Sequence, residues 1–317
     1  LDGRKGTVAV YNYKTGEILC AVTGPTFDPD NVPDIAADDS GKYDGVYLNR
    51  FIQSAYVPGS IFKIVTTAAA LECVDGIEDM TFTCSGKIEY GTEAVTCLSR
   101  HGKQNMRTAL ANSCNCAYAQ ITRQIGKEKM AWYIRSFGLT DSVCFDGITT
   151  AKGNYDVSNS APVELAWSCI GQHSNLVNPA RFMTFMGAVA NGGSAAEPYI
   201  MAKVESGAEL TYEAQVRKTG RLMPEKIADQ VKTYMRHNVE AVYGDWNFPG
   251  LKVCAKSGTA EVGGDREPNA VFAGFCADKD YPLAFMVVVE DAGSGAKNCV
   301  PIISKVLAAC KDMMDGE

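Results

Sequence analysis

A serine and a lysine three residues apart open an apolar stretch of the chain. Ser60 follows Pro58-Gly59, and Lys63 is followed by an uncharged run, residues 64–71. If the stretch is helical, positions i and i+3 share a face, so the Lys63 amine can reach the Ser60 hydroxyl. A serine becomes a good nucleophile when a base takes its proton, and burial lowers the pKa of a lysine enough for it to be that base. On its own the pair also fits a helix N-cap and a surface lysine.

A second polar pair lies further along the chain. Ser113 and Asn115 are two residues apart in a stretch of otherwise helical composition. Positions i and i+2 do not share a helix face, so the two side chains converge only if they lie on a turn between helices. There the hydroxyl could relay a proton and the amide could hold a substrate carbonyl. Serine and asparagine are favoured in turns in any case, so this pair alone is weak evidence.

The third group continues a predicted strand over residues 251–255. It consists of Lys256, Ser257, Gly258 and Thr259. A glycine inside a strand lets a ligand or another backbone come close. We expect the lysine to offer a cation, and the two hydroxyls to offer hydrogen bonds, to a substrate carboxylate. The backbone N–H groups of Thr259 and Ser60 would stabilise an oxyanion.

Two other segments match a Lys-Thr-Gly pattern and are rejected. Residues 14–16 occupy the turn of the first predicted hairpin, before Ser60 in the chain. Residues 218–220 lie between Arg217 and Arg221 and lead into a helix. Neither segment leads into the strands near the C-terminal end, so we expect both to be exposed turns.

Strand patterns lie at both ends of the chain and helical patterns lie between them. The predicted strands are residues 7–11, 18–22, 251–255, 270–276 and 283–289. The predicted helices are residues 61–73, 107–124, 127–136, 162–170, 179–191 and 224–241, with another after residue 295. This order predicts an α/β (α+β) fold: a five-stranded antiparallel sheet built from both termini, flanked by helices, with an inserted helical lobe.

The length fits a single domain with a sizeable core. We expect one domain over residues 1–317, with a sheet lobe of about residues 1–66 and 246–317 and a helical lobe of about residues 67–245. Residues 28–47, rich in Asp, should form a surface loop. The net charge of −7, without a Lys/Arg-rich run, argues against a nucleic-acid partner. No segment is apolar enough to span a membrane, so we expect a mature or excised domain without its anchor.

The twelve cysteines are mostly scattered singly. Cys84 and Cys97 bracket a turn-rich segment and could form a disulfide. Zinc is an alternative for three thiols expected near the cleft if a histidine comes close; these residues are Cys114, Cys116 and Cys254, with His101, His173 or His237. Buried packing cysteines are the interpretation we prefer, so we expect no cofactor and no metal ligand.

The three groups occur in the order SxxK, SxN and K[ST]G, which is the signature of penicillin-binding proteins and serine β-lactamases. The chain most resembles the transpeptidase domain of class B penicillin-binding proteins over nearly its whole length. The resembling segments are GRKGTVAV (3–10), KTGEILCA (14–21), FDPD (27–30), YVPGS (56–60), ELA (164–166), GQ (171–172), NP (178–179) and ANGG (190–193). One departure is Ser257, where many relatives have threonine, but the hydroxyl is kept.

The resemblance implies a peptidoglycan D,D-transpeptidase whose substrate is a stem peptide ending in D-Ala-D-Ala. Ser60 would form the acyl-enzyme and would also be acylated by β-lactam antibiotics, with Lys63 as base and Ser113 as proton relay. Asn115 would position the substrate, and residues 256–259 would bind its carboxylate. The resemblance also implies location at the extracytoplasmic face of the bacterial cell membrane, an N-terminal anchor outside this chain, and membrane cell-wall synthesis proteins as partners.

Three alternatives share the same motifs. A serine β-lactamase must hydrolyse its acyl-enzyme, and Glu164 is the nearest candidate in the chain to position the water, although it also fits a helix start. A β-lactam sensor would be acylated without turnover. A D,D-carboxypeptidase differs only in using water as the acceptor. A role in elongation, division or sporulation stays open.

Overall fold

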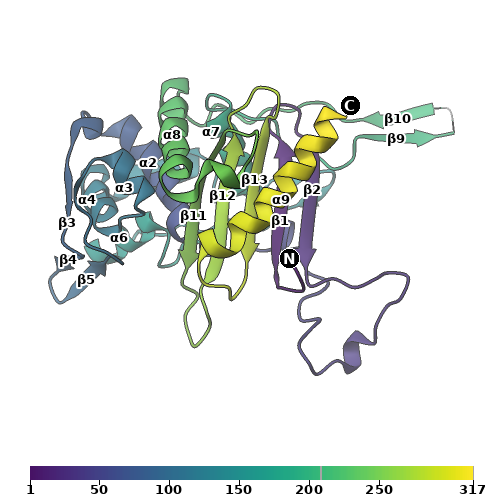
Figure 1. Ribbon diagram of the computed structural model, residues 1–317, viewed down its shortest axis with the longest axis horizontal. Helices are drawn as coiled ribbons and strands as arrows, with labels where there is room; N and C mark the ends of the chain where they lie inside the picture. Colours follow the sequence, from purple (N-terminus) through teal and green to yellow (C-terminus); the bar gives the residue numbers. More distant parts are fainter. Residues whose placement is uncertain (208, 317) are drawn as a thin grey trace.

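The computed structural model describes residues 1–207 and 209–316, and its centre is a five-stranded antiparallel sheet (Figure 1). The strand order is β11-β12-β13-β1-β2. The bounds are β1 Gly6–Asn12, β2 Ile18–Gly24, β11 Val253–Ala260, β12 Asn269–Cys276 and β13 Leu283–Val289. Strand β1 pairs with β13 on one side and with β2 on the other. The predicted fold class, with the sheet built from both ends of the chain, is confirmed.

Helices cover both faces of this sheet, and the strands are apolar for that reason. Helix α9 (Gly295–Asp315) packs on one face, whereas α7 (Pro179–Ala190) and α8 (Glu225–Asn238) pack on the other, α8 along β11. Every residue of β12 and β13 is buried. The two faces alternate along β1: Val8 and Val10 join the core beneath α9, while Ala9 and Tyr11 join the larger core on the helical side.

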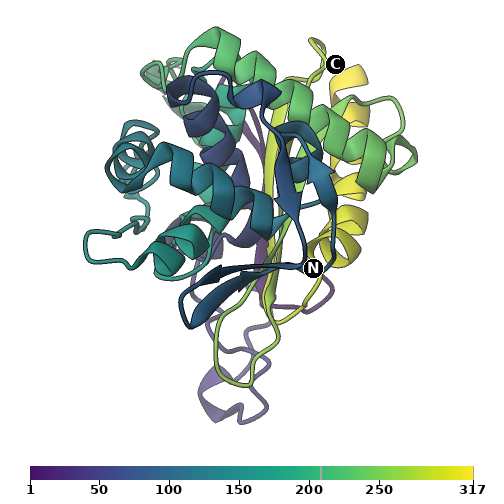
Figure 2. The same ribbon diagram turned by 90° about the vertical axis from the view of Figure 1, so that its left-hand side faces the viewer.

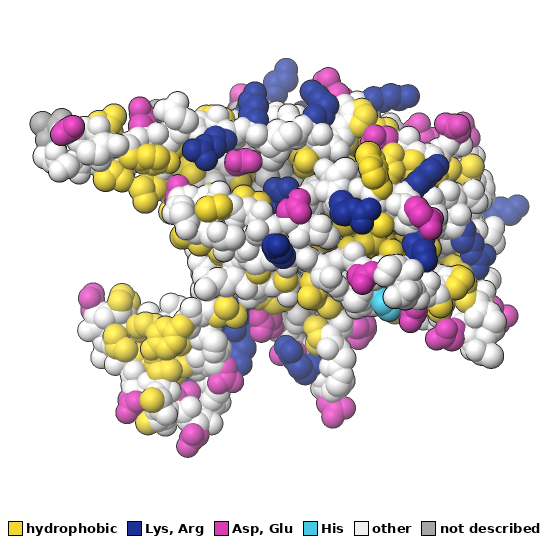
Figure 3. Space-filling model, turned by 180° about the vertical axis from the view of Figure 1, so that it is seen from behind, with side chains coloured by type: hydrophobic (Ala, Val, Ile, Leu, Met, Phe, Trp, Pro, Cys, Tyr) yellow, Lys and Arg dark blue, Asp and Glu magenta, His cyan; other side chains and the backbone are white. Residues whose placement is uncertain are grey.

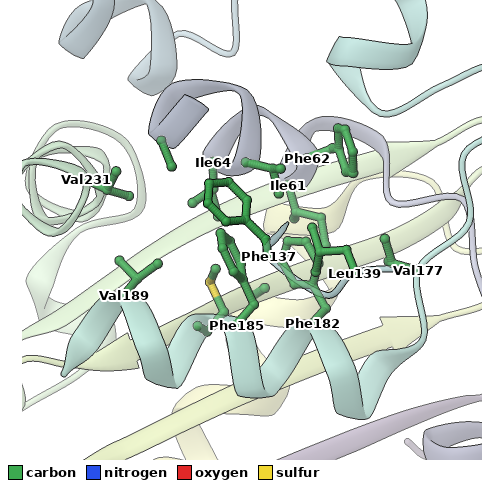
Figure 4. Packing of buried hydrophobic residues seen from close by; sticks show 14 of the residues in the cluster. Ile61, Phe62, Ile64, Phe137, Leu139, Val177, Phe182, Phe185, Val189 and Val231 are labelled. Atoms are coloured by element: carbon green, nitrogen blue, oxygen red, sulfur yellow. The ribbon is translucent and has the colours of Figure 1, made fainter. Parts of the chain in front are cut away.

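The larger core is organised around one buried helix. The short 3-10 turn η2 (Gly59–Phe62) leads directly into α2 (Lys63–Cys73). The surrounding helices are α1 Arg50–Gln53, α3 Met106–Ala111, α4 Asn115–Ile125, α5 Lys127–Ser136 and α6 Pro162–Ile170. Phe137 lies between Ile64 of α2 and Phe185 of α7 (Figure 4), with its ring centroid 5.4 Å from that of Phe185. The packing fixes the orientation of α2 and therefore of the turn before it.

The structure differs from the predicted elements in two respects. The helix predicted over residues 107–124 is divided into α3 and α4 by a turn at residues 112–114. Four short two-stranded sheets were not predicted: β3 (Phe82–Cys84) with β6 (Gly102–Gln104), β4 (Lys87–Tyr90) with β5 (Glu93–Thr96), β7 (Cys144–Phe145) with β8 (Ile148–Thr149), and β9 (Lys203–Ser206) with β10 (Glu209–Glu213). All but the first are hairpins, and β3 is joined to β6 through the β4–β5 hairpin; the four are called the short hairpins below. Their strands have two to five residues and are mostly exposed, so even where apolar and polar residues alternate, as in β4 and β10, the pattern is too short to indicate a strand.

Two segments project from the body of the molecule. One is the β9–β10 hairpin and the other is the loop over residues 28–47, which is largely exposed and contains only the turn η1 (Ile35–Ala37) (Figures 1 and 3). The loop therefore lies at the surface, as predicted. Lysine and arginine side chains are interspersed with acidic ones over the face in Figure 3. Among the helices of residues 1–207 and 209–316, none combines the length and apolar character needed to cross a bilayer. The division into two lobes stays a prediction.

Candidate active site

The turn that carries Ser60 is held against the edge strand of the sheet. Gly59 has φ +54°, and a Cβ there would lie 2.6 Å from the carbonyl oxygen of Thr259. A Cβ on Gly258 would in turn lie 2.9 Å from the carbonyl oxygen of Pro58 and 3.2 Å from the Ser60 nitrogen. Only glycine on both sides permits this approach. Strand β11 therefore runs directly beside the backbone of Ser60.

Lys63 is fully buried beneath Ser60. Its Nζ lies 2.7 Å from Ser60 Oγ, 2.8 Å from Asn115 Oδ1 and 3.1 Å from the carbonyl oxygen of Ser113. Burial disfavours the ammonium form and lowers the pKa of Lys63 to about 7. A neutral amine has two N–H donors and one lone pair. The amide and carbonyl oxygens only accept, so they take both donors and leave the lone pair for the Ser60 hydroxyl.

Ser113 and Asn115 lie on the turn between α3 and α4, as their spacing predicts. Ser113 has φ +52°, an uncommon backbone conformation for a residue with a side chain. Its Oγ lies 3.3 Å from Lys63 Nζ and 3.1 Å from Lys256 Nζ. Asn115 begins α4 and its Nδ2 donates to the carbonyl oxygen of Thr96, 2.9 Å away. The serine hydroxyl therefore bridges the two lysines.

Lys256 was expected to offer a cation to the substrate carboxylate, but its side chain is buried. It is 1% exposed, and its Nζ donates to Ser113 Oγ and to the carbonyl oxygen of Ser257, 2.8 Å away. Burial, together with the nearby Lys63, lowers its pKa well below the usual range of lysine. The amine thus lies behind the wall of the cleft, while Ser257 and Thr259 line the cleft itself.

Tyr243 contacts the third motif from behind the cleft and was not found from the sequence. The Tyr243 hydroxyl accepts a hydrogen bond from the Ser257 nitrogen at 2.8 Å and lies 2.9 Å from Ser257 Oγ. Tyr243 ends the π-helical turn after α8 and is buried, with its ring edge-on to Phe272. Nothing in the local sequence marks this tyrosine, because its role depends on how α8 packs along β11.

These residues surround a cleft of about 510 Å³. Of the eight predicted site residues, Ser60, Ser113, Asn115, Ser257 and Thr259 line it. Lys63 and Lys256 lie immediately behind its wall, and Gly258 packs against the Ser60 turn. Cleft residues that the sequence did not indicate include Thr96, Cys97, Leu98, Ser99, Asn112, Ile170 and Glu261, with His101, Trp167 and Gln172. Figure 2 faces the helices and short hairpins on this side, with the sheet behind them.

The rejected Lys-Thr-Gly segments do not line this cleft. Residues 14–16 form the turn between β1 and β2. In the second segment Lys218 is exposed, but Thr219 is 9% exposed and its Oγ accepts from the Ala195 nitrogen at 3.1 Å. The second segment is therefore not the open turn that we expected, although its exclusion from the site holds.

None of the twelve cysteines, all of which fall in the described residues, forms a disulfide. The pairing suggested for Cys84 and Cys97 is therefore not seen. Cys254 is buried in β11, apart from the cysteines near the α3–α4 turn.

The family described as "Penicillin binding protein transpeptidase domain" has a sequence model that matches residues 6–308. The chain belongs to this family. Its curated relatives include Stage V sporulation protein D of Bacillus subtilis, which is 29% identical over 95% of this chain and 48% of that protein. Peptidoglycan D,D-transpeptidase PbpA of Mycolicibacterium smegmatis is 26% identical over 96% of this chain and 67% of that protein. The chain thus spans about half the length of the first of these relatives.

Solved structures agree with this assignment. The D,D-transpeptidase domain of a peptidoglycan glycosyltransferase from Eggerthella lenta superposes with a TM-score of 0.87 at 27% identity, covering 99% of this chain and 79% of that one. A ceftriaxone acyl-enzyme complex of penicillin-binding protein A from M. tuberculosis gives 0.84 at 25% identity, covering 96% of this chain and 74% of that one.

Proposed function

We propose that this domain is a peptidoglycan D,D-transpeptidase that cross-links stem peptides through an acyl-enzyme on Ser60. We also propose that β-lactams acylate the same serine. The observation that carries the proposal is the buried Lys63 amine, with its pKa near 7, 2.7 Å from Ser60 Oγ. The names of the relatives and the acyl-enzyme complex of the mycobacterial protein support it.

In the acylation step the lone pair of Lys63 takes the Ser60 proton while Oγ attacks the carbonyl of the penultimate D-alanine. The Ser60 N–H lies at the first turn of η2, where helical N–H groups have no partner within the helix. The carbonyl oxygen of Thr259 accepts from Gln172 Nε2 at 3.4 Å, on the side of β11 away from β12. In an antiparallel strand the N–H of that residue points the same way. These two N–H groups form the proposed oxyanion hole.

Collapse of the tetrahedral intermediate requires a proton for the departing D-alanine amine. The Ser113 hydroxyl contacts both Lys63 and Lys256, so it can pass the proton from Lys63 toward the leaving group. An amine of a second stem peptide then attacks the acyl-enzyme and reverses these transfers. We assign Asn115 to the substrate carbonyl, and Ser257 and Thr259 to the terminal carboxylate. Lys256 supports this end of the cleft through Ser113 and the Ser257 carbonyl.

The β-lactamase alternative depends on a carboxylate that positions water, and the first candidate for this role is already engaged. Glu164 accepts from the Ala161 nitrogen at 2.8 Å at the start of α6, and its carboxylate lies 3.6 Å from His173 Nε2. It does not line the cleft in the described structure. This contact favours the helix-start role for Glu164 over the positioning of water.

The proposed substrate lies outside the cytoplasmic membrane, so we place the domain there. The proposal includes an anchor outside this chain and neighbouring membrane proteins of cell-wall synthesis. Fractionation of cells that express the full-length protein tests the anchor. We expect the protein in the membrane fraction, and its recovery in the soluble fraction would contradict the anchor.

Intact mass after incubation with a fluorescent penicillin tests the nucleophile. We expect one adduct on the wild-type chain and on the Ser99→Ala control, which changes another cleft serine, and none on Ser60→Ala. An adduct that persists in Ser60→Ala would place the nucleophile elsewhere. With a lipid-linked precursor, cross-linked product indicates transpeptidation, release of D-alanine alone indicates carboxypeptidation, and neither indicates a sensor. Repeated nitrocefin turnover would favour a β-lactamase.

A further inference from the structure

Three cysteines and one histidine gather at the rim of the cleft. They are Cys84, Cys97, His101 and Cys114, and their sulfur and ring nitrogen atoms all lie within 4.8 Å of one another. The four residues come from separate places: the end of β3, the residue after β5, the residue before β6 and the N-cap of α4. Cys84 and Cys114 are buried, and the other two are half-buried.

Three of the six distances between these four atoms match the edges of a zinc tetrahedron, and the other three are below 4.8 Å. Cys97 Sγ lies 3.9 Å from Cys114 Sγ, while His101 Nδ1 lies 3.5 Å from Cys97 Sγ and 3.6 Å from Cys84 Sγ. With Zn–S near 2.3 Å and Zn–N near 2.1 Å, a tetrahedral site has S···S edges of about 3.8 Å and S···N edges of about 3.6 Å. We propose that Cys84, Cys97, His101 and Cys114 bind one Zn²⁺ ion.

The donor set favours zinc over the alternatives. Thiolate and imidazole ligands in a tetrahedral arrangement are typical of structural zinc, whereas calcium and magnesium require oxygen ligands. A disulfide would use two of the sulfurs and leave the third thiol and the imidazole without a function. Backbone N–H groups also face the sulfurs, as thiolates prefer: the Ala117 nitrogen donates to Cys114 Sγ at 3.4 Å.

The sulfur of Cys97 is suited to bind a metal as a thiolate. The hydrogen bond between the two thiols lowers the pKa of Cys97 and raises that of Cys114, and the backbone N–H groups of Ser99, Asn115 and Cys116 also point to the Cys97 sulfur. Ligand thiols must lose their protons when zinc binds. This supports the proposal, which depends on the geometry of the four ligands.

The four protein ligands leave no open position, so the ion would be structural and would not activate water. Its importance comes from Cys114, which lies between Ser113 and Asn115. Zinc would tie this turn to the segment of β3 to β6, whose Thr96 carbonyl already accepts from Asn115 Nδ2. We infer that the metal positions the proton relay and the substrate amide relative to Lys63.

The ligand set differs from the three thiols considered from the sequence. Cys114 and His101 belong to it, whereas Cys116 and Cys254 do not. Cys84 and Cys97 take their places, although they were considered only as a disulfide pair. The four ligands could not be grouped from the sequence, because three of them come together only through the short strands β3 to β6, which the sequence pattern did not reveal.

Metal analysis of the reduced, zinc-loaded and desalted chain tests the site directly. We expect one zinc ion per chain in the wild type and in Cys299→Ser, a control that changes a buried cysteine on α9. Cys97→Ser and His101→Ala should bind zinc at least about tenfold more weakly. Cobalt in place of zinc should give thiolate-to-metal charge-transfer absorption and the visible bands of a tetrahedral ion. A wild-type chain without zinc, or variants that bind zinc as well as the wild type, would overturn the proposal.

The acylation rate then separates this site from the proposed function. Removal of zinc by a chelator should slow acylation by fluorescent penicillin about 10- to 100-fold, and added zinc should restore it. Ser60→Ala should bind zinc as the wild type does and form no penicillin adduct. Zinc binding and acylation can therefore be lost separately, so failure of one proposal does not imply failure of the other. Circular dichroism of each variant identifies loss of folding. A peptide map of the wild-type chain that shows a disulfide between two of Cys84, Cys97 and Cys114 would contradict the zinc site.

Discussion

Lys63 is the residue through which pH should control the reaction. Its amine is charged below a pKa of about 7 and cannot accept the Ser60 proton in that state. We therefore predict that the second-order rate of acylation rises about tenfold per pH unit below 7 and levels off above it. Acylation rates between pH 5 and 9, with circular dichroism at each pH to confirm folding, check this. A rate independent of pH below 7 would assign the base to another group.

Lys256 should affect the rate through Ser113, because its amine contacts the Ser113 hydroxyl behind the cleft wall. Replacement with methionine, Lys256→Met, keeps the length of the side chain and removes the hydrogen bonds. We predict a fall in acylation rate on the order of 100-fold, with the fold retained.

Lys218→Met is the matched control for this change. Lys218 begins the other Lys-Thr-Gly segment and is exposed outside the cleft. Its replacement should leave the acylation rate unchanged. Equal losses in the two variants would show that the effect of Lys256→Met comes from the loss of a charge anywhere in the protein.

The predictable part of the site consists of residues whose spacing has a local meaning. Ser60 and Lys63 share a turn of one helix, so their contact follows from periodicity. The burial of Lys256 and the role of Tyr243 do not follow from periodicity, because both depend on how β11 packs between α8 and the Ser60 turn.

At the scale of elements, the close approach of η2 and β11 depends on Gly258. A methyl group at this position would lie 2.9 Å from the Pro58 carbonyl oxygen and 3.2 Å from the Ser60 nitrogen. Gly258→Ala should push the strand away from the oxyanion N–H groups. We predict a loss of about 1–3 kcal/mol in the free energy of unfolding, measured with urea, and a clearly slower acylation.

Gly220→Ala provides the comparison, because Gly220 is the last residue of the rejected segment at 218–220. Its Cβ would have no atom within 4 Å. The change should leave the acylation rate and, within about 0.5 kcal/mol, the stability unaffected. Comparable damage from both substitutions would contradict the close-packing argument.

The elements that were predicted correctly are those with continuous apolar patterns. Strands β12 and β13 are buried along their whole length, and α9 has its apolar residues at helical spacing. The break between α3 and α4 was implied only by the Ser113/Asn115 pair, since residues 107–124 have helical composition throughout. Strands β3, β4 and β5 pack against α4, and β5 also packs against α6; such contacts leave no trace in composition.

At the scale of the whole molecule, the sheet couples its two cores. Phe285 of β13 is fully buried on the α9 face and stacks on Phe272, with ring centroids 5.8 Å apart. Phe285→Ala should lower the free energy of unfolding by about 3–5 kcal/mol in one cooperative transition. Urea unfolding followed by tryptophan fluorescence and by circular dichroism measures this.

The exposed Trp246, at 80% exposure, provides a control for loss of an aromatic side chain. Trp246→Ala should change the stability by no more than about 0.5 kcal/mol. Because this variant lacks one of the three tryptophans, its unfolding is followed by circular dichroism alone. Two separate transitions in Phe285→Ala would show that the two faces of the sheet unfold independently.

The position of β1 between β2 and β13 has a consequence for the order in which the protein can fold during its synthesis. Residues 6–12 are made before the other strands of the sheet, yet one of their two partner strands is completed only at residue 289. A nascent chain shorter than this carries a two-stranded hairpin whose outer edge is unpaired, and such a hairpin is marginally stable in water. The growing chain should therefore stay open and sensitive to protease until β13 has emerged, and limited proteolysis of chains that end before and after residue 289 checks this.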